Sequence, residues 1–318
     1  MYKDKKIGVV IPAYNEERLI ISTLKTVPDF VDKIYVVNDC SKDDTLKLIT
    51  KYASSHRRVT VIDHAINQGP GAAIIHGYDR AREDNIDIIA TMDGDGQMDP
   101  SYLHLFLEPI IEGKCDFTGG NRLLSDASHH GMSKFRFFGN SILSFLTKIA
   151  SGYWQLLDPQ NGYTAISARA LDTIPYQKMY PRYGYLNERL MLLNVYGFRV
   201  RNVSHPARYA DEKSTIKYST YIPRVSKLLL KLFLRRMLTK YVLFGFHPLV
   251  FYYLFGTIFS LCGIISAIVA VIIKFVIHHD QLFMYGMLSL ILFSIGMMFI
   301  FFAMFFDMQN ENADKGWY

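Results

Sequence analysis

Two long apolar runs near the end of this 318-residue chain constrain its fold more than any other feature. Residues 249–273 and residues 282–306 each form a stretch of 25 residues without a charged side chain. Because about 20 apolar residues span the hydrocarbon core of a bilayer, either run can cross a membrane. The short segment 274–281 between them therefore predicts a transmembrane hairpin. The alternative is a hairpin buried in a soluble protein, but nothing else in the chain is large enough to cover two such helices.

A cluster of basic residues precedes the first apolar run and predicts its orientation. The segment 224–240 contains no acidic residue and six basic ones, namely Arg224, Lys227, Lys231, Arg235, Arg236 and Lys240. Basic residues beside a first span stay on the cytoplasmic side, so the N-terminal part and the tail after the hairpin should both be cytoplasmic. Lys227, Lys231 and Arg235 recur every four residues, which predicts an amphipathic helix over 225–240 with its cations on lipid phosphates. A solvated helix face is the alternative.

These features divide the chain into four predicted parts. They are a soluble domain over residues 1–222, amphipathic juxtamembrane helices over 223–247, two transmembrane helices over 248–306 and a cytoplasmic tail over 307–318. We expect a multi-pass protein of the cell membrane, or of the endoplasmic reticulum membrane in a eukaryote, with the lipid bilayer as a partner. The sequence leaves a homo-oligomer open.

Composition and charge exclude two classes of protein. Half of the residues are apolar and 20% are charged, which is not the composition of a disordered chain. The net charge of +6 reflects the local cluster at 224–240 rather than general basicity, so we expect no nucleic-acid partner. Cys40, Cys115 and Cys262 are far apart and have neither a disulfide nor a zinc-binding spacing.

The N-terminal part alternates short apolar runs with helical patterns. We expect strands over 7–11, 33–37, 59–62 and 86–92, and helices over 16–26, 42–53, 70–81 and 100–112. This alternation is typical of α/β folds, in which helices wrap a parallel sheet. Ligands of such folds bind beyond the carboxyl ends of the strands. Polar segments at 12–17, 38–45 and 93–97 follow three of the predicted strands, so we expect the binding site there.

The most specific local motif is Asp-Gly-Asp-Gly-Gln at residues 93–97. Asp93 and Asp95 can turn toward one divalent cation, because the glycines let the backbone stay close. Such an ion keeps open positions for phosphate oxygens. Asp39 and Glu16 follow two other strands and should open on the same edge, which favours a nucleoside diphosphate as the ligand. A common surface Asp-Gly turn is the alternative.

The glycine-containing segment 67–73 superficially resembles a phosphate-binding loop. It lacks the third glycine of a dinucleotide fingerprint and the lysine and hydroxyl residue of a P-loop, so a dinucleotide enzyme or an ATPase is disfavoured. Gly71 could still bring the positive end of the following helix close to a ligand. A simple tight turn is the alternative.

Four motifs in this order resemble those of family 2 glycosyltransferases with the GT-A fold, namely the segments 12–17, 38–45, 67–71 and 93–100. More narrowly, residues 5–240 resemble polyprenyl-phosphate glycosyltransferases, the group that contains the dolichol-phosphate mannose and glucose synthases. The resemblance implies a Rossmann-like GT-A catalytic domain with a mostly parallel sheet. Paired C-terminal spans also occur in members of that group. The expected architecture is therefore this catalytic domain, an interfacial helix and a transmembrane hairpin.

The resemblance implies roles for the residues that match its motifs. Binding of the nucleotide-sugar is expected of Pro12, Tyr14, Glu16, Asp39, Gly71, Asp93, Asn187 and Glu188. Mg²⁺ or Mn²⁺ on the diphosphate is expected at Asp93, Asp95 and Gln97. Catalytic roles are expected of Asp95, Asp158 and Arg122, and contacts with the acceptor phosphate of Arg122, Arg136, Arg208 and Lys213. Three positions depart from the family pattern: Pro70 stands where many relatives carry lysine, Gly94 replaces alanine and Asn121 replaces serine.

The implied reaction is the inverting, metal-dependent transfer of a hexose or N-acetylhexosamine from a nucleotide-diphosphate sugar to a polyprenyl or dolichyl phosphate. A UDP-sugar is favoured over GDP-mannose as the donor. The lipid phosphate is already an anion near neutral pH, so no strong general base is needed. One alternative is a membrane-anchored family 2 enzyme with a non-lipid acceptor. Another is a non-catalytic subunit that binds the nucleotide-sugar or lipid within a membrane complex.

Overall fold

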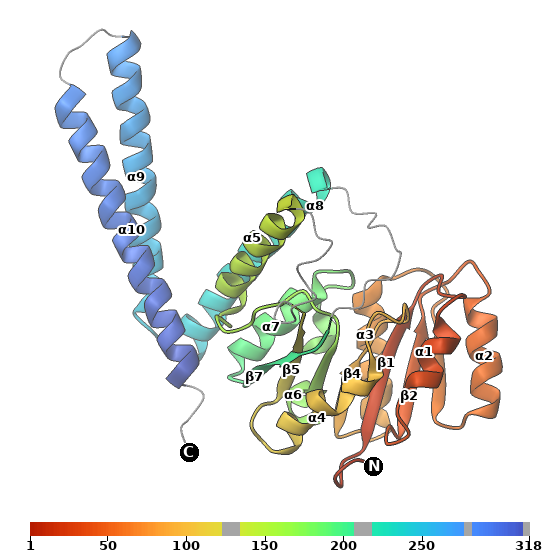
Figure 1. Ribbon diagram of the computed structural model, residues 1–318. Helices are drawn as coiled ribbons and strands as arrows, with labels where there is room; N and C mark the ends of the chain where they lie inside the picture. The colour runs from red at the N-terminus through yellow and green to blue at the C-terminus, as the bar shows by residue number, and fades with distance from the viewer. Residues whose placement is uncertain (123–133, 207–217, 277–281, 314–318) are drawn as a thin grey trace. The chain divides into compact units, whose positions relative to one another are not determined.

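The computed structural model describes residues 1–122, 134–206, 218–276 and 282–313 (Figure 1). The chain divides into two compact units, Met1–Phe233 and Leu234–Tyr318. The first unit is an α/β domain and the second contains two long apolar helices. The four-part division drawn from the sequence, with boundaries after residues 222, 247 and 306, stays a proposal.

The first unit is built on a seven-stranded sheet with the order β3-β2-β1-β4-β6-β5-β7. Its strands are β1 (Ile7–Ala13), β2 (Lys33–Asn38), β3 (Val59–Asp63), β4 (Ile88–Thr91), β5 (Phe117–Asn121), β6 (Thr164–Ser167) and β7 (Val200–Ser204). Its helices are α1 (Ile20–Thr26), α2 (Thr45–Ser55), α3 (Pro70–Glu83), α4 (Leu103–Ile111), α5 (Lys134–Ser151), α6 (Ala168–Thr173), α7 (Tyr185–Val195) and most of α8 (Tyr218–Leu238), with short 3₁₀ turns at Pro100–Tyr102 and Tyr176–Lys178. Only β6 is antiparallel to its neighbours, so the prediction of a mostly parallel GT-A sheet is confirmed.

The two faces of the sheet are both buried, which explains the continuous apolar runs of the central strands. Val9 and Ile11 of β1 belong to one core cluster, together with residues of α1 and α4. Val10, between them, belongs to the cluster on the other face, with residues of α3 and α7. Successive side chains of a strand point to opposite faces, so a strand covered on both sides must be apolar throughout.

Two expected boundaries differ from the structure for identifiable reasons. We expected the first strand to end before Pro12, but β1 continues through Pro12, which pairs with Val37 of β2. We expected the first helix to begin at residue 16, whereas α1 begins at Ile20. The amide of Glu16 instead donates to Thr45 Oγ1 at 2.8 Å, so this segment is tied to the second polar loop before the helix starts.

Helix α8 has two different apolar faces. Leu229 and Leu232 are buried in the core of the α/β domain. Leu230, Leu234 and Leu238 recur every four residues and are 59%, 57% and 55% exposed. Lys227 and Lys231 lie beside this stripe and are also exposed. An exposed row of leucines flanked by lysines is typical of a helix lying in a membrane interface, although contact with lipid stays a prediction.

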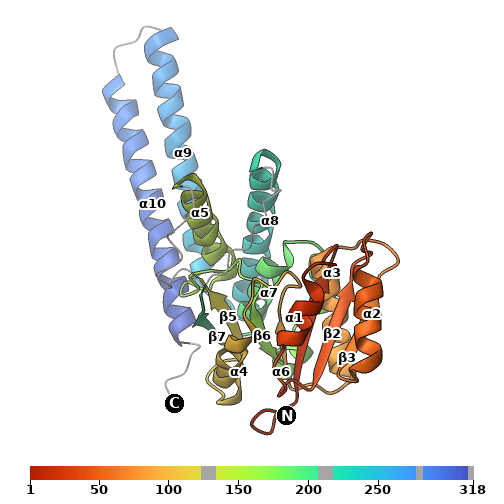
Figure 2. The same cartoon turned by 45° about the vertical axis from the view of Figure 1, so that its right-hand side comes forward.

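The second unit contains α9 (Leu249–Val276) and α10 (Leu282–Ala313), which run side by side as a hairpin in both views (Figure 1, Figure 2). Within them, Leu249–Phe275 and Met284–Glu311 are long and apolar enough to cross a membrane. Glycines let the two backbones approach: a Cβ on Gly263 would lie 2.7 Å from the amide nitrogen of Phe293.

A buried ion pair connects the end of α8 to the end of α10. Arg236 is fully buried, and its Nη1 and Nη2 atoms donate to the two oxygens of Asp307, each at 2.8 Å. Tyr241, in the π-helical turn Thr239–Phe244, donates a third hydrogen bond to Asp307 at 2.6 Å. Arg236 was counted in the basic cluster of the sequence, but its guanidinium is neutralised by Asp307 inside the protein.

Candidate active site

Five polar segments meet at one edge of the sheet because of strand direction. β1, β2 and β4 are parallel, so the segments that follow them leave the same edge. β6 is antiparallel to β4, with Thr164 opposite Thr91, so the segment 158–163 that precedes β6 reaches that edge as well. Arg122 follows β5, which pairs with the start of β6 through Gly119 and Thr164.

The acidic motif 93–97 contacts the segments on both sides of it. Gly94 packs against the first motif, where a Cβ would lie 3.3 Å from the Pro12 carbonyl oxygen and 3.6 Å from Glu16 Cγ. Gly162 packs against Asp93, where a Cβ would lie 3.1 Å from Asp93 Oδ2. The two aspartates therefore lie between the first motif and the segment that carries Asp158.

Burial and mutual repulsion make this pair of carboxylates hard to ionise. Burial, with the nearby charge of Asp95, raises the pKa of Asp93 to about 7, against the opposing effect of Arg122. Burial also raises the pKa of Asp95, although the Gln97 amide donates to its Oδ1 at 2.9 Å and opposes the shift. A bound cation would favour the charged form of both groups, so the site is suited to a cation.

The donor set fits a divalent ion that takes part of its coordination from the substrate. Carboxylate oxygens are hard ligands of the kind that Mg²⁺ and Mn²⁺ prefer. Across the described residues, no group of three or more His, Cys, Asp or Glu side chains could hold a metal. Asp93 and Asp95, with Gln97 beside them, would supply few protein ligands and leave positions for phosphate oxygens. The metal assignment stays a prediction.

The first two motifs are tied to each other by hydrogen bonds from the backbone. The amide of Asn15, a residue with φ of 59°, donates to Ser41 Oγ at 3.0 Å. The amide of Lys42 donates to Asn15 Oδ1 at 2.8 Å. Tyr14 is 43% exposed beside this junction, so its ring is accessible to a ligand, as its predicted role in nucleotide binding requires.

Asp39 follows β2 and is held by three hydrogen-bond donors. Its Oδ1 accepts from His64 Nδ1 and from the Gln68 amide, and its Oδ2 accepts from the Gly69 amide, each at 2.8 Å. His64 Nε2 lies 2.7 Å from Nδ1 of His76 on α3. Neither histidine was predicted from the sequence to belong to the site. A signal was present, because His64 directly follows β3, whose carboxyl end lies at the same edge.

Gly71 contacts protein backbone rather than open space. A Cβ at this position would lie 2.8 Å from the carbonyl carbon of Pro181 and closer still to the Tyr180 carbonyl oxygen. The amide of Ala72, in the first turn of α3, donates to the Pro181 carbonyl oxygen at 2.9 Å. This packing accounts for a glycine at the position, while the predicted approach of the helix end to a ligand stays untested.

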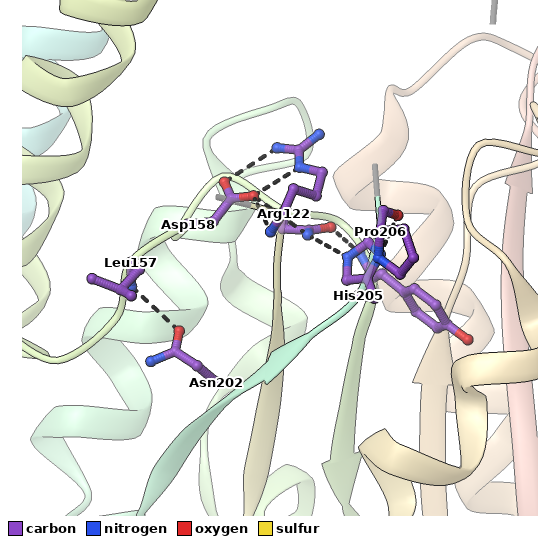
Figure 3. Close-up of polar contacts among 8 residues, drawn as sticks. Arg122, Leu157, Asp158, Asn202, His205 and Pro206 are labelled. Atoms are coloured by element: carbon purple, nitrogen blue, oxygen red, sulfur yellow. Dashed lines mark hydrogen bonds and ion pairs between the residues drawn. The ribbon is translucent and has the colours of Figure 1, made fainter. Parts of the chain in front are cut away.

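Arg122 and Asp158 form a bidentate ion pair (Figure 3). Arg122 Nε lies 2.7 Å from Asp158 Oδ2, and Nη2 lies 3.1 Å from Oδ1. The Asp158 side chain is 9% exposed and that of Arg122 is 41% exposed. Catalytic roles were predicted for both residues, and contact with the acceptor phosphate for Arg122. The structure brings them together as one unit in which Asp158 orients the guanidinium.

Asn161 connects this ion pair to His205, since its Nδ2 also lies 3.5 Å from Asp158 Oδ2. Asn161 Nδ2 donates to His205 Nε2 at 2.9 Å, and His205 Nδ1 lies 3.1 Å from the Pro206 carbonyl oxygen (Figure 3). His205 is therefore a neutral imidazole with its proton on Nδ1. Burial lowers the pKa of His205, in agreement with a neutral ring. Gly120 leaves room for both side chains, since a Cβ there would lie 2.6 Å from Asn161 Nδ2.

Asn187 and Glu188, on α7, are buried at 3% and 7% exposure. Asn187 Oδ1 accepts hydrogen bonds from Gln160 Nε2 at 2.8 Å and from Thr147 Oγ1 at 3.2 Å. Glu188 Oε2 accepts from the Tyr180 amide at 2.8 Å. Asn187 therefore holds the segment that contains Asp158, and Glu188 holds the backbone at Tyr180. Direct contact of either side chain with a donor sugar stays a prediction.

The other predicted phosphate contacts have no described side chain. Arg136 belongs to α5, and its side chain lies outside the described part of the structure. Arg208 and Lys213 lie outside the described residues.

Comparison with known proteins identifies the family of this chain. The family described as glycosyl transferase family 2 matches residues 8–174. A UDP-N-acetylglucosamine–dolichyl-phosphate N-acetylglucosaminyltransferase of Methanococcus voltae is 32% identical over 202 residues, which are 59% of this chain and 80% of that protein. A dolichyl-phosphate beta-glucosyltransferase of Trichomonas vaginalis is 37% identical over 98 residues, which are 27% of this chain and 28% of that protein.

Solved structures share the fold. Glucosyl-3-phosphoglycerate synthase of Mycobacterium tuberculosis, crystallised with Mn²⁺, UDP and its product, aligns with a TM-score of 0.54 and 18% identity, over 73% of this chain and 80% of that one. The same synthase has also been crystallised with Mg²⁺ and UDP. With its GT-A sheet and its acidic motif at the carboxyl edge, this chain belongs to glycosyltransferase family 2 and is an enzyme similar to dolichyl-phosphate sugar transferases.

Proposed function

We propose that this enzyme transfers a hexose or N-acetylhexosamine from a nucleotide-diphosphate sugar, preferably a UDP-sugar, to a polyprenyl or dolichyl phosphate, with inversion at the anomeric carbon. The observation that carries the proposal is the position of Asp93 and Asp95 between the first motif and the Asp158 segment. The relative from Methanococcus voltae, named for a UDP-sugar donor and a dolichyl-phosphate acceptor, supports both substrates.

The proposed cofactor is Mg²⁺ or Mn²⁺ held by Asp93, Asp95 and Gln97. When bound, this ion would neutralise charge on the departing diphosphate. The raised pKa of Asp93 and the shortage of other acidic ligands in the described chain agree with a site that the donor completes. The structures of the crystallised synthase contain UDP with Mn²⁺ or Mg²⁺, which is consistent with this assignment.

The chemistry needs charge stabilisation and alignment more than proton transfer. An oxygen of the ionised lipid phosphate forms a bond to the anomeric carbon, while the bond from that carbon to the diphosphate oxygen breaks. The nucleoside diphosphate leaves with the electron pair of that bond, and no proton has to be removed from the acceptor. Attack from the side opposite the leaving group converts an α-linked donor into a β-linked product.

We propose that Arg122 aligns the acceptor phosphate and that Asp158 holds the Arg122 guanidinium in place. The ion pair with Asp158 uses the Nε and Nη2 atoms of the guanidinium. The planar fork of an arginine carries five donors, a geometry that suits both carboxylates and phosphates. Arg136, Arg208 and Lys213 are proposed as further phosphate contacts.

The acceptor requires that the site work at a membrane. Two helices with the length and composition of membrane spans, and the exposed leucines and lysines of α8, support membrane association. We propose that the catalytic domain and the C-terminus face the cytoplasm, as the basic cluster before α9 predicts.

A transfer assay tests the proposal. Purified protein in detergent is given Mn²⁺, a short polyprenyl phosphate and, in separate reactions, radiolabelled UDP-N-acetylglucosamine, UDP-glucose or GDP-mannose. We expect the label of a UDP-sugar to enter an organic-extractable, acid-labile product with a β-linkage by NMR. Consumption of a donor with label only in the water-soluble fraction, and none in the lipid, would contradict the proposed acceptor.

A further inference from the structure

A chain of three side chains runs from the edge of the sheet to helix α3. It links Asp39, after β2, to His64, after β3, and then to His76. The side chains of Asp39 and His64 are 5% and 3% exposed, and His76 is half-buried. The rings of the two histidines meet edge to face, with centroids 4.8 Å apart.

The carboxylate fixes the end of this chain at Asp39. A carboxylate only accepts, so Nδ1 of His64, which is 2.8 Å from Asp39 Oδ1, must carry a proton. Nε2 of His64 and Nδ1 of His76 lie 2.7 Å apart and share one hydrogen bond. The two histidines thus form one hydrogen-bonded chain that ends on the carboxylate.

Counting acceptor positions shows what Asp39 can still bind. A carboxylate has about four lone-pair positions on its two oxygens. Oδ1 uses two of them, for His64 and the Gln68 amide, and Oδ2 uses one, for the Gly69 amide. One position remains, on Oδ2. Asp39 can therefore accept one more hydrogen bond, but not a pair of parallel ones.

This count distinguishes between nucleobases. Uracil offers a single ring N–H, which lies between two carbonyl oxygens. Guanine offers two adjacent parallel donors, a ring N–H and an amino group, which pair with a carboxylate through both of its oxygens. Since Oδ1 of Asp39 is already filled, the site fits one donor.

We propose that His64 and His76 are positioning residues that hold the Asp39 carboxylate with one acceptor position open, and that this position selects uracil over guanine by its single ring N–H. The proposal rests on the proposed function, because it takes Asp39 as a nucleotide contact. It assigns the two histidines a part in donor specificity. Loss of a hydrogen bond to a charged group should weaken the affinity for the nucleotide by about tenfold, which can be measured.

Binding measurements with a blocked base test the positioning role. Affinities for UDP, GDP and 3-methyl-UDP, in which a methyl group replaces the ring N–H, are measured by calorimetry on the full-length protein with Mn²⁺. We expect the wild type to bind UDP about tenfold more tightly than either of the others. We expect His64→Leu to lose about tenfold for UDP and little for 3-methyl-UDP, so that the preference disappears.

Matched variants separate positioning from a merely structural effect. His64→Asn keeps an N–H near the position of Nδ1 and should restore most of the preference. His76→Leu removes the hydrogen bond between the two histidines from a half-buried site and should lower the preference for UDP over 3-methyl-UDP about threefold. This variant tests the positioning role if His64→Leu does not fold. His104, on α4 and outside this chain of residues, provides the control His104→Leu, which should bind as the wild type does. Steady-state kinetics should show the loss in the donor KM, with kcat changed less than about twofold.

Three results would overturn the inference: equal binding of UDP and 3-methyl-UDP by the wild type, an unchanged preference in folded His64→Leu and His76→Leu, or equal losses for both ligands. Failure of the proposed reaction gives a different result. If no sugar reaches a lipid but the binding pattern is as expected, the acceptor is wrong and the positioning role is supported. If GDP binds more tightly than UDP and GDP-mannose is the working donor, the reaction class stands and the inference is wrong.

Discussion

At the scale of single residues, the protonation of Asp93 is the feature with the most direct consequences. Its pKa is raised to about 7, so between about pH 4 and pH 7 the metal-free folded protein holds a proton here that the unfolded chain has lost. A group with a raised acid pKa destabilises the fold increasingly as pH rises from its unfolded pKa, near 4, to its folded pKa. Above about pH 7 that cost is complete, at about 1.4 kcal/mol for each unit of the shift.

We therefore expect Asp93→Asn to be more stable than the wild type in EDTA, by an amount that grows between about pH 4 and pH 7 and is then constant. Chemical unfolding of both proteins in detergent at a series of pH values measures this difference. Mn²⁺ should stabilise the wild type at pH 8 and leave Asp93→Asn nearly unchanged. A difference between the two proteins that does not vary with pH would contradict the assignment.

The bidentate geometry of Arg122 and Asp158 gives a second prediction at this scale. Lysine keeps the charge but cannot bind the carboxylate and a phosphate through separate edges. We expect Arg122→Lys to lower kcat/KM for the lipid phosphate about tenfold or more, while the donor KM changes little. Initial rates at varied acceptor concentration measure this. Unchanged acceptor kinetics in Arg122→Lys would show that the arginine only supports Asp158.

At the scale of elements, parallel strands were predictable and the reversed one was not. Apolar runs marked β1 to β4, and the signal was continuous in β1, β2 and β4 because these strands are buried on both faces. β6 has only four residues, and nothing in its sequence indicates that it runs antiparallel between β4 and β5. Because β6 runs antiparallel, the segment before it brings Asp158 to the edge where Asp93 lies. The pattern of strands could not predict this position, so Asp158 was predicted only from the resemblance to a family.

The ion pair between α8 and α10 was also invisible in the sequence. In the sequence, Arg236 is one of six clustered basic residues and Asp307 is the first residue of the predicted tail. The two residues are 71 positions apart, so no local pattern predicts that they form a pair. Breaking a buried pair by removing one partner costs about 3–5 kcal/mol, because the other charge is left buried. We expect Asp307→Ala to lower the thermal stability of the detergent-solubilised protein strongly, and Arg236→Met with Asp307→Leu to recover much of the loss. Equal stability of Asp307→Ala and the wild type would contradict a structural role for the pair.

The exposed face of α8 provides a prediction about the membrane. Leu230, Leu234 and Leu238 are little more than half exposed, so burial of the remaining surface of each in a lipid interface would be favourable by about 1 kcal/mol. We expect Leu230→Gln with Leu234→Gln, or Lys227→Gln with Lys231→Gln, to raise the apparent KM for the lipid acceptor in vesicles of anionic lipid and to spare donor binding. Substitution of the buried Leu229 should instead lower stability. An unchanged lipid KM in both double variants would exclude an interfacial role for this face.

At the scale of the whole molecule, the chain combines the proposed site for a water-soluble donor with two helices that are long and apolar enough to cross a membrane. Composition and motifs were enough to predict both, because apolar length and the acidic motif are local signals. The hydrogen-bonded groups around the site, such as His64 with Asp39 and Asn161 with His205, depend on which strand ends become neighbours. Local sequence does not contain that information, so these supporting residues could be found only from the fold.

The most direct test of the central claim measures metal binding and turnover on the same variant. Mn²⁺ binding in the presence of UDP, followed by electron paramagnetic resonance, and sugar transfer to a polyprenyl phosphate are compared for the wild type, Asp95→Ala and Asp95→Glu. We expect tight UDP-dependent Mn²⁺ binding and transfer by the wild type, loss of both by about 100-fold or more in Asp95→Ala with the fold intact, and partial recovery in Asp95→Glu. Full turnover by Asp95→Ala in the presence of EDTA would contradict a metal held by Asp93 and Asp95.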